Sequence, residues 1–154
     1  MIEIDVNGTL RTTPASPDTP LVYVLRNDFG LAATRVGCGA EQCGACVVLV
    51  DGAPKYACTL RAADAAGKHV STVEGLARDG EPHALQRAFL EEQAAQCGYC
   101  VSGMLMRATA LLESNPSPDD AAVRAALEPQ LCRCGSHNRI VRAVLRAAAA
   151  MKAR

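Results

Sequence analysis

The segment RVGCGAEQCGACVVLVDG, residues 35–52, crowds cysteine and glycine together more densely than a packed protein core requires. Three cysteines fall within nine residues: Cys38, Cys43 and Cys46. Glycines are interleaved with them, although glycine weakens regular structure instead of building it. The segment runs into an apolar stretch that is typical of a buried strand. We therefore expect the three sulfurs to hold an inorganic group in a loop that precedes a β-hairpin.

The spacing of these cysteines indicates which group they hold. The order C-x4-C-x2-C, followed by Cys58 after eleven further residues, is the plant-type arrangement for a [2Fe–2S] cluster. A glycine-rich loop can turn its backbone N–H groups toward the sulfurs, which lowers the cost of concentrating negative charge. Zinc sites also use four cysteines, but zinc knuckles usually pair two short C-x2-C turns. The x4 gap therefore favours an iron cluster.

A second set of four cysteines lies in the other half of the chain. Cys97 and Cys100 occur in QCGYC, and Cys132 and Cys134 occur in LCRCG. Both pairs precede expected helices, whose N-terminal ends stabilise thiolates and negative clusters. By spacing alone, this set is equally consistent with zinc and with an iron–sulfur cluster.

The first half of the chain has the pattern of a small sheet crossed by one helix. Its apolar and polar residues alternate as in half-buried strands, and the dipeptides Asn7-Gly8 and Asp51-Gly52 are typical hairpin turns. The expected elements are strands at 2–6 and 9–13, a helix at 21–27, a hairpin within 46–58 and a strand within 68–76. Together they predict a compact α+β unit.

The second half has a helical pattern throughout. Helices are expected at residues 82–93, with Pro82 at the first helical position, and at 102–114, 119–128 and 137–154. Short connections between four helices predict a four-helix bundle. The change of pattern near residue 78 predicts an N-terminal domain over 1–77 and a helical domain over 78–154, each with one set of four cysteines.

Composition excludes several classes of protein. The formal net charge is zero and the charges are well mixed, so the basic stripe of a nucleic-acid-binding protein is missing. We find no apolar run near the ~18 residues of a membrane span, and we expect no secretory signal. We therefore expect the protein to be cytoplasmic, unless a partner recruits it to a membrane or is exported together with it. In a reducing compartment the cysteines would be ligands and not disulfides.

The sequence offers no catalytic machinery of its own. We find no Ser-His-Asp arrangement, no phosphate-binding loop and no paired carboxylates. This favours an electron carrier without catalytic residues.

The joint pattern resembles a known family. GCGAEQCGAC with a later cysteine, then QCGYC and LCRCG in a helical half, is similar to the two-cluster iron–sulfur subunit of the molybdenum hydroxylases, the xanthine oxidase family. EQAAQCGYC and LCRCGSHNRI look most like the small subunits of nicotinate dehydrogenase and isoquinoline 1-oxidoreductase. The resemblance implies a β-grasp ferredoxin domain and a four-helix bundle, each holding one [2Fe–2S] cluster.

The resemblance also implies partners and a direction of electron flow. A large subunit would carry molybdenum on a pyranopterin, as molybdopterin cytosine dinucleotide, and would oxidise an N-heteroaromatic or aldehyde substrate. Electrons would pass to the cluster of the second set, then to that of the first, and on to an FAD subunit or a cytochrome c. In the family, the residues that match Gln96 and Cys134 contact the pterin, and Cys134 would also bind iron.

The sequence departs from the common family pattern at three places. VSGM replaces the usual TPGM after Cys100, CRCGSH replaces CRCTGY, and Glu41 stands where glycine is common. The second change favours the nicotinate and isoquinoline branch over an FAD partner. On residue type alone, Gln96 would be a solvated glutamine and His137 a helix-cap or surface residue.

Two other functions compete with that of an electron-transfer subunit. A free ferredoxin-like electron carrier should be polar over most of its surface, whereas a subunit should expose an apolar patch. A zinc-stabilised interaction module should be colourless and unaffected by dithionite.

Overall fold

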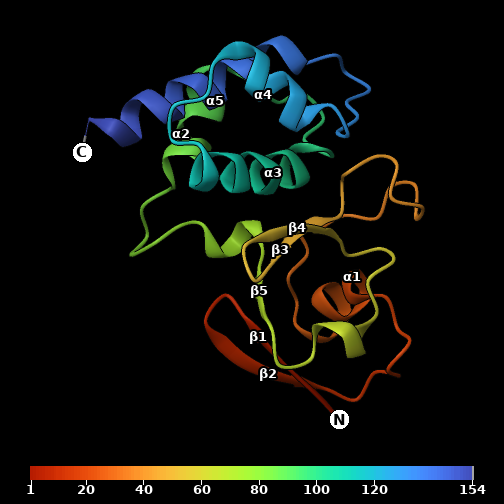
Figure 1. The fold of residues 1–154 in the computed structure, drawn as a ribbon. Coiled ribbons are helices and arrows are strands. Elements are labelled where there is room, and N and C mark those ends of the chain that lie inside the picture. Colours follow the sequence, from red (N-terminus) through yellow and green to blue (C-terminus); the bar gives the residue numbers. More distant parts are fainter. Residues whose placement is uncertain (154) are drawn as a thin grey trace.

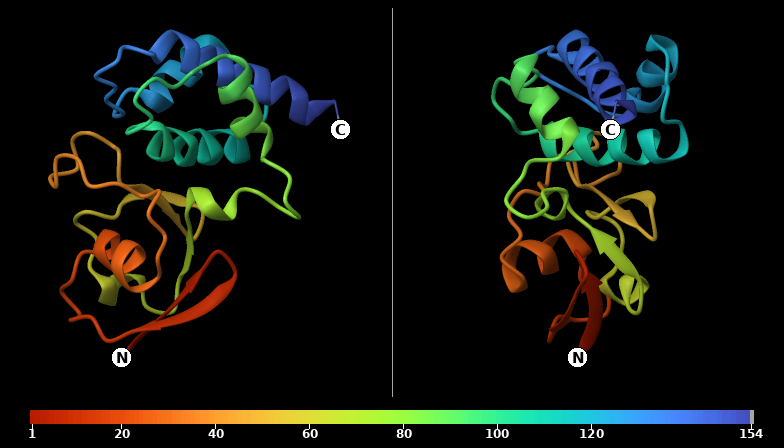
Figure 2. Two further views of the ribbon diagram at one scale, coloured as in Figure 1. Left: turned by 180° about the vertical axis from the view of Figure 1, so that it is seen from behind. Right: turned by 90° about the vertical axis from the view of Figure 1, so that its left-hand side faces the viewer.

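The computed structural model describes residues 1–153, and Arg154, at the end of the last expected helix, lies outside that range. The strands and the short helix α1 form the lower half of the molecule in Figure 1, and four longer helices form the upper half. The two views of Figure 2 agree that the helical half sits across one side of the sheet-containing half. The expected α+β class is therefore confirmed.

One mixed sheet organises the first half. Its strands are β1 (Ile2–Val6), β2 (Thr9–Thr13), β3 (Val47–Val50), β4 (Ala53–Tyr56) and β5 (His69–Ser71). Their order is β2-β1-β5-β3-β4. The pair β1 and β5 is parallel, and the other three pairs are antiparallel.

Both expected hairpins form, and the backbone at their turns explains why. Two successive residues have positive φ in each turn: Asn7 at 55° and Gly8 at 77°, Asp51 at 50° and Gly52 at 79°. Turns of the I′ type require this conformation at both central residues, and Asn-Gly and Asp-Gly adopt it most easily. The turns therefore fix the register of β1 with β2 and of β3 with β4.

The short helix predicted at 21–27 is less regular than expected. It begins as α1 (Leu21–Tyr23) and continues as the π-helical turn η1 (Val24–Asp28). Its apolar side chains pack with Ile4 and Val6 of β1 in a fully buried cluster. Two short 3-10 turns, η2 (Ala62–Ala65) and η3 (Val73–Gly75), connect β4 to β5 and β5 to the helical half.

The four expected helices of the second half are present, with boundaries within two residues of the prediction. They are α2 (Ala84–Glu91), α3 (Val101–Ser114), α4 (Asp120–Leu127) and α5 (His137–Lys152). The predicted start at Pro82 is wrong, because His83 caps α2 and the helix begins at Ala84.

Strand β3 joins the two halves. All four of its residues are buried, so neither of its faces meets solvent. Val48 and Val50 belong to the core of the first half, whereas Val47 and Leu49 pack into the core of the helices. Because strand side chains alternate between faces, the helical layer covers one face of β3 and α1 lies toward the other.

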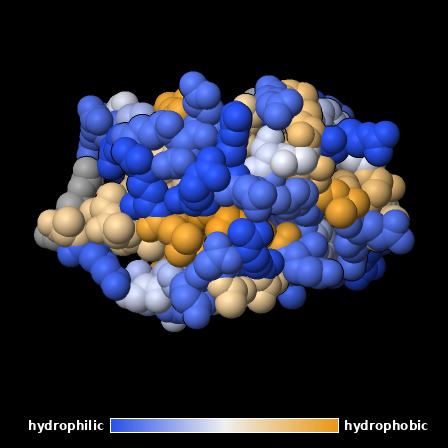
Figure 3. Space-filling view, turned by 90° about the horizontal axis from the view of Figure 1, so that it is seen from above, coloured by the Kyte–Doolittle hydropathy of each residue, from blue (hydrophilic) through white to orange (hydrophobic). Residues whose placement is uncertain are grey.

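Seen from above, the helical layer is largely hydrophilic, and hydrophobic residues show as a band in its middle and as smaller patches elsewhere (Figure 3). The large apolar side chains exposed in the described part of the helical half are Leu90, Tyr99, Leu131 and Met151. No helix within residues 1–153 is both long and apolar enough to cross a membrane.

Candidate metal centres

The first cysteine loop directs backbone N–H groups at its own sulfurs. The N–H groups of Ala40, Gln42 and Cys43 lie 3.2 to 3.3 Å from the Cys38 sulfur, and that of Cys38 lies 3.3 Å from the Cys43 sulfur. The donors at Ala40 and Gln42 are the main reason that the pKa of Cys38 falls to about 7. Glu41 takes part in this turn at a positive φ of 60°, a conformation that glycine adopts more easily. The loop therefore has the cradle of N–H donors expected around a negative cluster.

A close approach explains the glycine just before Cys38. A Cβ added to Gly37 would lie 2.6 Å from the Cys43 sulfur, well inside van der Waals contact. Any larger residue at position 37 would displace that sulfur. The glycine thus makes room for a ligand atom.

The other two cysteines of this set come from the ends of the second hairpin. Cys46 immediately precedes β3 and Cys58 follows β4, and both are buried, with exposed fractions of 2% and 9%. Burial raises the pKa of Cys46 to about 12, so a bound cation is needed before this thiol can ionise at neutral pH. The set combines an exposed edge at Cys38 with a buried edge at Cys46 and Cys58.

The second set lies where two helix connections meet. Cys97 and Cys100 lie between α2 and α3, and Cys132 and Cys134 lie between α4 and α5. The N–H of Tyr99, 3.5 Å from the Cys97 sulfur, lowers the pKa of that thiol, whereas burial raises the pKa of Cys100 to about 12. Burial also opposes ionisation of Cys132, but backbone N–H donors led by that of Ser136 lower its pKa on balance.

All eight thiols are free. Within each set they lie close enough to shift one another's pKa: Cys43 acts on Cys38, Cys58 on Cys46, Cys134 on Cys97, and Cys132 on Cys100. In residues 1–153, no three His, Cys, Asp or Glu side chains surround one point as ligands of a single ion do. A [2Fe–2S] cluster takes two protein ligands on each iron, whereas structural zinc takes all four on one ion. Each half supplies the four thiols that a two-iron cluster requires.

The two sets are joined by direct backbone contact. The N–H of Leu131, next to Cys132, donates to the carbonyl of Cys43 over 3.0 Å. The first turn of α3 lies against the same loop, since a Cβ on Gly103 would be 2.0 Å from the Gly44 carbonyl oxygen. A cavity of about 210 Å³ lies at this junction and is lined by cysteines of both sets, with Tyr99, Leu131 and Arg133.

Two side chains that sequence reasoning did not single out also bridge the sets. Gln130 is 1% exposed, and its amide, oriented to satisfy its neighbours, donates to the Gly44 carbonyl over 3.1 Å and accepts from Arg107 over 3.3 Å. The Tyr99 hydroxyl donates to the Val36 carbonyl over 2.5 Å. The sequence shows that Gln130 is near Cys132 and that Tyr99 is next to Cys100. It does not show their partners, because Gly44 is 86 residues from Gln130 and Val36 is 63 residues from Tyr99.

The other predicted site residues lie on the rim of the second set. Gln96 and Cys97 are exposed, and Cys134 is half-buried. His137 begins α5, and its Nε2 lies 3.1 Å from the carbonyl of Gln130. This contact ties the start of α5 to the residue that precedes the loop with Cys132 and Cys134. His137 is half-buried and does not cap the helix, whose N-cap is Ser136.

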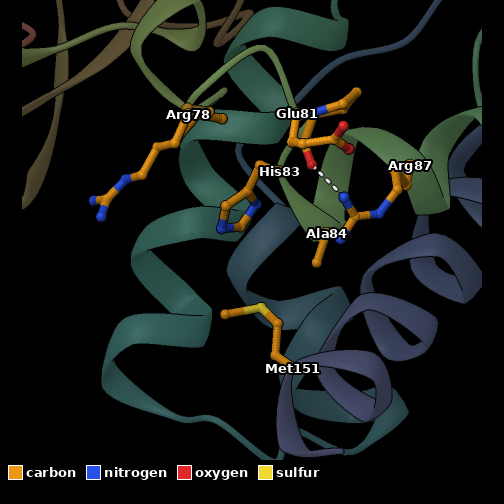
Figure 4. A pocket seen from close by; sticks show the side chains of 8 residues that line it. Arg78, Glu81, His83, Ala84, Arg87 and Met151 are labelled. Atoms are coloured by element: carbon orange, nitrogen blue, oxygen red, sulfur yellow. Dashed lines mark hydrogen bonds between the residues drawn. The ribbon is translucent and has the colours of Figure 1, made fainter. Parts of the chain in front are cut away.

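A pocket without cysteines lies at the start of α2 (Figure 4). His83 lies between Arg78 and Arg87, and Met151 of α5 faces it from below. The ring Nδ1 accepts the N–H of Leu85 over 3.2 Å and so caps the helix. Burial first, and then the two guanidinium groups, lower the pKa of His83 below its ordinary value near 6.5. The side chain is therefore held neutral as a cap, and we assign it no catalytic role.

This cap predicts a pH dependence of stability. Because the folded state disfavours the imidazolium, His83 should reduce stability as the pH falls below about 6.5, where the unfolded chain takes up a proton. His83→Asn retains a capping side chain that does not titrate. In urea unfolding between pH 7.5 and 5.5, we expect the wild type to lose more stability than the variant. Equal losses in both proteins would contradict this role of His83.

Comparison with known proteins supports both cluster sites. A family described as "2Fe-2S iron-sulfur cluster binding domain" matches residues 4–77. A second family, described as "[2Fe-2S] binding domain", matches residues 72–145. Together they account for both cysteine sets with two [2Fe–2S]-binding domains.

Relatives match over nearly the whole chain. A nicotinate dehydrogenase subunit of Pseudomonas putida is 50% identical, over 96% of this chain and 94% of its own. An isoquinoline 1-oxidoreductase subunit of Brevundimonas diminuta is 44% identical, over 96% of this chain and 97% of its own. A chain in the crystal structure of quinoline 2-oxidoreductase from Pseudomonas putida 86 superposes with a TM-score of 0.94 and is 37% identical in sequence. The match covers 99% of this chain and 95% of that chain. This chain therefore belongs to the iron–sulfur, electron-transfer subunits of the molybdenum hydroxylases.

Proposed function

We propose that electrons enter this chain at the second cysteine set, cross to the first set and leave at the exposed loop around Cys38. The observation that carries the proposal is the contact between the sets, where the N–H of Leu131 donates to the carbonyl of Cys43. Electron transfer needs redox centres close together and held rigidly, and a backbone hydrogen bond between the two loops supplies both conditions. The exposed cysteine of each set, Cys97 or Cys38, lines the cavity at the junction, which supports the transfer of electrons from one set to the other.

All eight cysteines are proposed as iron ligands. They are Cys38, Cys43, Cys46 and Cys58 for the first cluster, and Cys97, Cys100, Cys132 and Cys134 for the second. Each cluster, when bound, takes up and releases one electron at a time. The chain's own contribution is the cradle of N–H donors, because hydrogen bonds to sulfur set the potential at which this happens.

We further propose the finer architecture that goes with this role. The first domain, residues 1–77, would be a β-grasp fold of the plant ferredoxin type, and residues 78–154 would form a four-helix bundle. The mixed sheet with α1 against it supports the first assignment. The packing of α2 on α5 and of α4 on both α3 and α5 supports the second.

The electron donor is proposed to be molybdopterin cytosine dinucleotide on a large partner subunit. Gln96 and Cys134 would meet the pterin, and this is supported by the exposure of Gln96 on the rim of the second set. The substrate, oxidised on that partner, would be an N-heteroaromatic ring or an aldehyde. Support comes from relatives named for nicotinate, isoquinoline and quinoline.

The acceptor is proposed to be a cytochrome c or an FAD subunit that docks on the exposed loop of the first set. Residues 37–42 of this loop are all exposed, which supports an approach from outside. The complex would work in the cytoplasm, where thiols stay reduced until iron binds.

The surface favours a subunit over a free carrier. Leu131 is 58% exposed and Tyr99 is 45% exposed, and both line the junction between the cysteine sets. Leu90, 74% exposed, adds to the apolar surface of the helical layer. Exposed apolar side chains beside a redox site suit a face that is covered in a complex.

Metal analysis of the natively purified complex tests the proposal. We expect about four irons per chain and about one molybdenum, as two [2Fe–2S] clusters and one molybdenum partner require. Four irons in a chain that never co-purifies with molybdenum would support the free carrier instead. Zinc in place of half the iron would overturn the assignment of the second set.

A further inference from the structure

Two buried serine hydroxyls beside the second cysteine set have no hydrogen-bond partner. Across residues 1–153, four buried side-chain polar atoms lack a partner: Asp5 Oδ1, Arg11 Nε, Ser102 Oγ and Ser136 Oγ. Asp5 and Arg11 each have another side-chain atom in a hydrogen bond, with His69 and with the carbonyl of Phe29. Each serine has only its hydroxyl, and each stands two residues after a cysteine of the second set, in Cys100-x-Ser and Cys134-x-Ser.

Ser136 is the better placed of the two. Its backbone N–H is the donor that contributes most to lowering the pKa of the Cys132 thiol, which places the residue close to that sulfur. It occupies the N-cap of α5, where a serine hydroxyl normally accepts a backbone N–H of the first turn. Here the hydroxyl makes no capping hydrogen bond, and the side chain is only 4% exposed.

Leaving a buried hydroxyl without a hydrogen-bond partner costs free energy of folding. We therefore expect the bound cluster to supply an acceptor for it. Ser136 follows Cys134 by two residues and Cys132 by four, so a cluster held by these cysteines would bring sulfur acceptors close to its hydroxyl. An anionic sulfur is a strong acceptor for a hydroxyl proton. We propose that the Ser136 hydroxyl donates a hydrogen bond to a sulfur of the second cluster and thereby raises its reduction potential. The inference rests on the proposed binding of that cluster by the second set.

The expected effect follows from charge. Reduction adds one electron to a cluster that is already negative, so a hydrogen-bond donor stabilises the reduced form more than the oxidised form. A higher potential at the second cluster would help it to accept electrons from the donor. Ser136 thus acts directly on the redox equilibrium of the cluster and touches no substrate.

Redox titration of the loaded chain, followed by electron paramagnetic resonance, tests the role of Ser136. In Ser136→Ala we expect the iron content and the first cluster to be unchanged. The reduction equilibrium of the second cluster should shift about tenfold toward the oxidised form, which is about 59 mV for a one-electron couple. In the same variant, one exchangeable proton coupled to the reduced second cluster should disappear from the spectrum.

Thr109→Val provides the matched control. The Thr109 hydroxyl is also buried in the helical half, but it donates to the Leu105 carbonyl over 2.8 Å. Its removal should leave both potentials unchanged. If Ser136→Ala leaves the potential and the proton coupling unchanged, the hydroxyl has another partner, such as an ordered water, and the inference is wrong. If the wild type itself gives no second cluster signal, the proposed ligand set fails instead.

Discussion

Replacing Cys43 by serine is expected to halve the iron content, from about four to about two atoms per chain, and to stop sustained turnover of the complex. Thiolates bind iron, whereas a serine hydroxyl stays protonated at neutral pH and is a poor ligand. The molybdenum partner should still oxidise substrate once, because the first cluster lies downstream of it. Steady-state activity with the natural acceptor should fall close to zero. The amount of product formed in a single turnover, measured on the same preparation, should stay unchanged.

The neighbouring residue supplies the control for this experiment. Gln42 is exposed and contributes its backbone N–H to the Cys38 sulfur, and that N–H remains in Gln42→Ser. The control should therefore keep four irons and normal turnover. Cys43→Ser also keeps the backbone carbonyl that accepts the N–H of Leu131, so the contact between the two sets should survive. Normal steady-state turnover in Cys43→Ser would show that electrons leave by another route.

Local signals made most of the secondary structure predictable. The two hairpins depend on Asn-Gly and Asp-Gly dipeptides, which adopt positive φ without help from the rest of the fold. The helices were predicted within two residues because their apolar periodicity is strong. The start of α2 was missed because histidine is an uncommon cap, and only the folded chain brings the His83 ring onto the N–H of Leu85. The π-helical turn of η1 likewise carries no signal in the sequence.

The membership of the two cysteine sets stays a prediction from their spacing, whereas the contacts within each set have no signal in the sequence. Spacing shows that Cys38, Cys43 and Cys46 share a loop, but it does not show which sulfurs are neighbours. Cys134 lies close enough to act on the pKa of Cys97 because two helix connections, from different parts of the chain, meet at one end of the helical layer. Such a contact depends on how helices pack, and local spacing contains no record of it.

One sequence pattern does indicate that the two halves pack against each other. The run VVLV at 47–50 is apolar at every position, and a strand exposed on one face would alternate instead. Continuous apolarity indicates burial on both faces, which the helical layer provides through Val47 and Leu49. The burial of Gln130 could not be predicted in this way, because a polar residue in a loop is normally solvated.

Gly103→Ala is expected to separate the two halves and to weaken the interaction between the clusters. Helix propensity alone would favour alanine in α3 by about 1 kcal/mol. The new Cβ, however, would lie 2.0 Å from the Gly44 carbonyl oxygen and 3.2 Å from the Ala45 Cα. Both are backbone atoms of the first cluster loop, so no side chain can rotate to relieve the overlap. Overpacking of this kind costs about 1–3 kcal/mol, and more where backbone must move.

Because the overlap is with backbone, the upper end of this cost applies, and subtracting the gain in helix propensity leaves an expected net loss of about 2 kcal/mol. The melting temperature should fall by about 2–4 °C for each kcal/mol lost. The magnetic interaction between the two reduced clusters should weaken as α3 moves away from the Gly44 loop. Ser114→Ala, at the exposed end of the same helix, should change stability by no more than about 0.5 kcal/mol and leave the interaction intact. A Gly103→Ala protein with wild-type melting and wild-type magnetic interaction would mean that the Gly103–Gly44 contact does not hold the clusters together. In that case the hydrogen bond from Leu131 to Cys43 alone would have to fix their spacing.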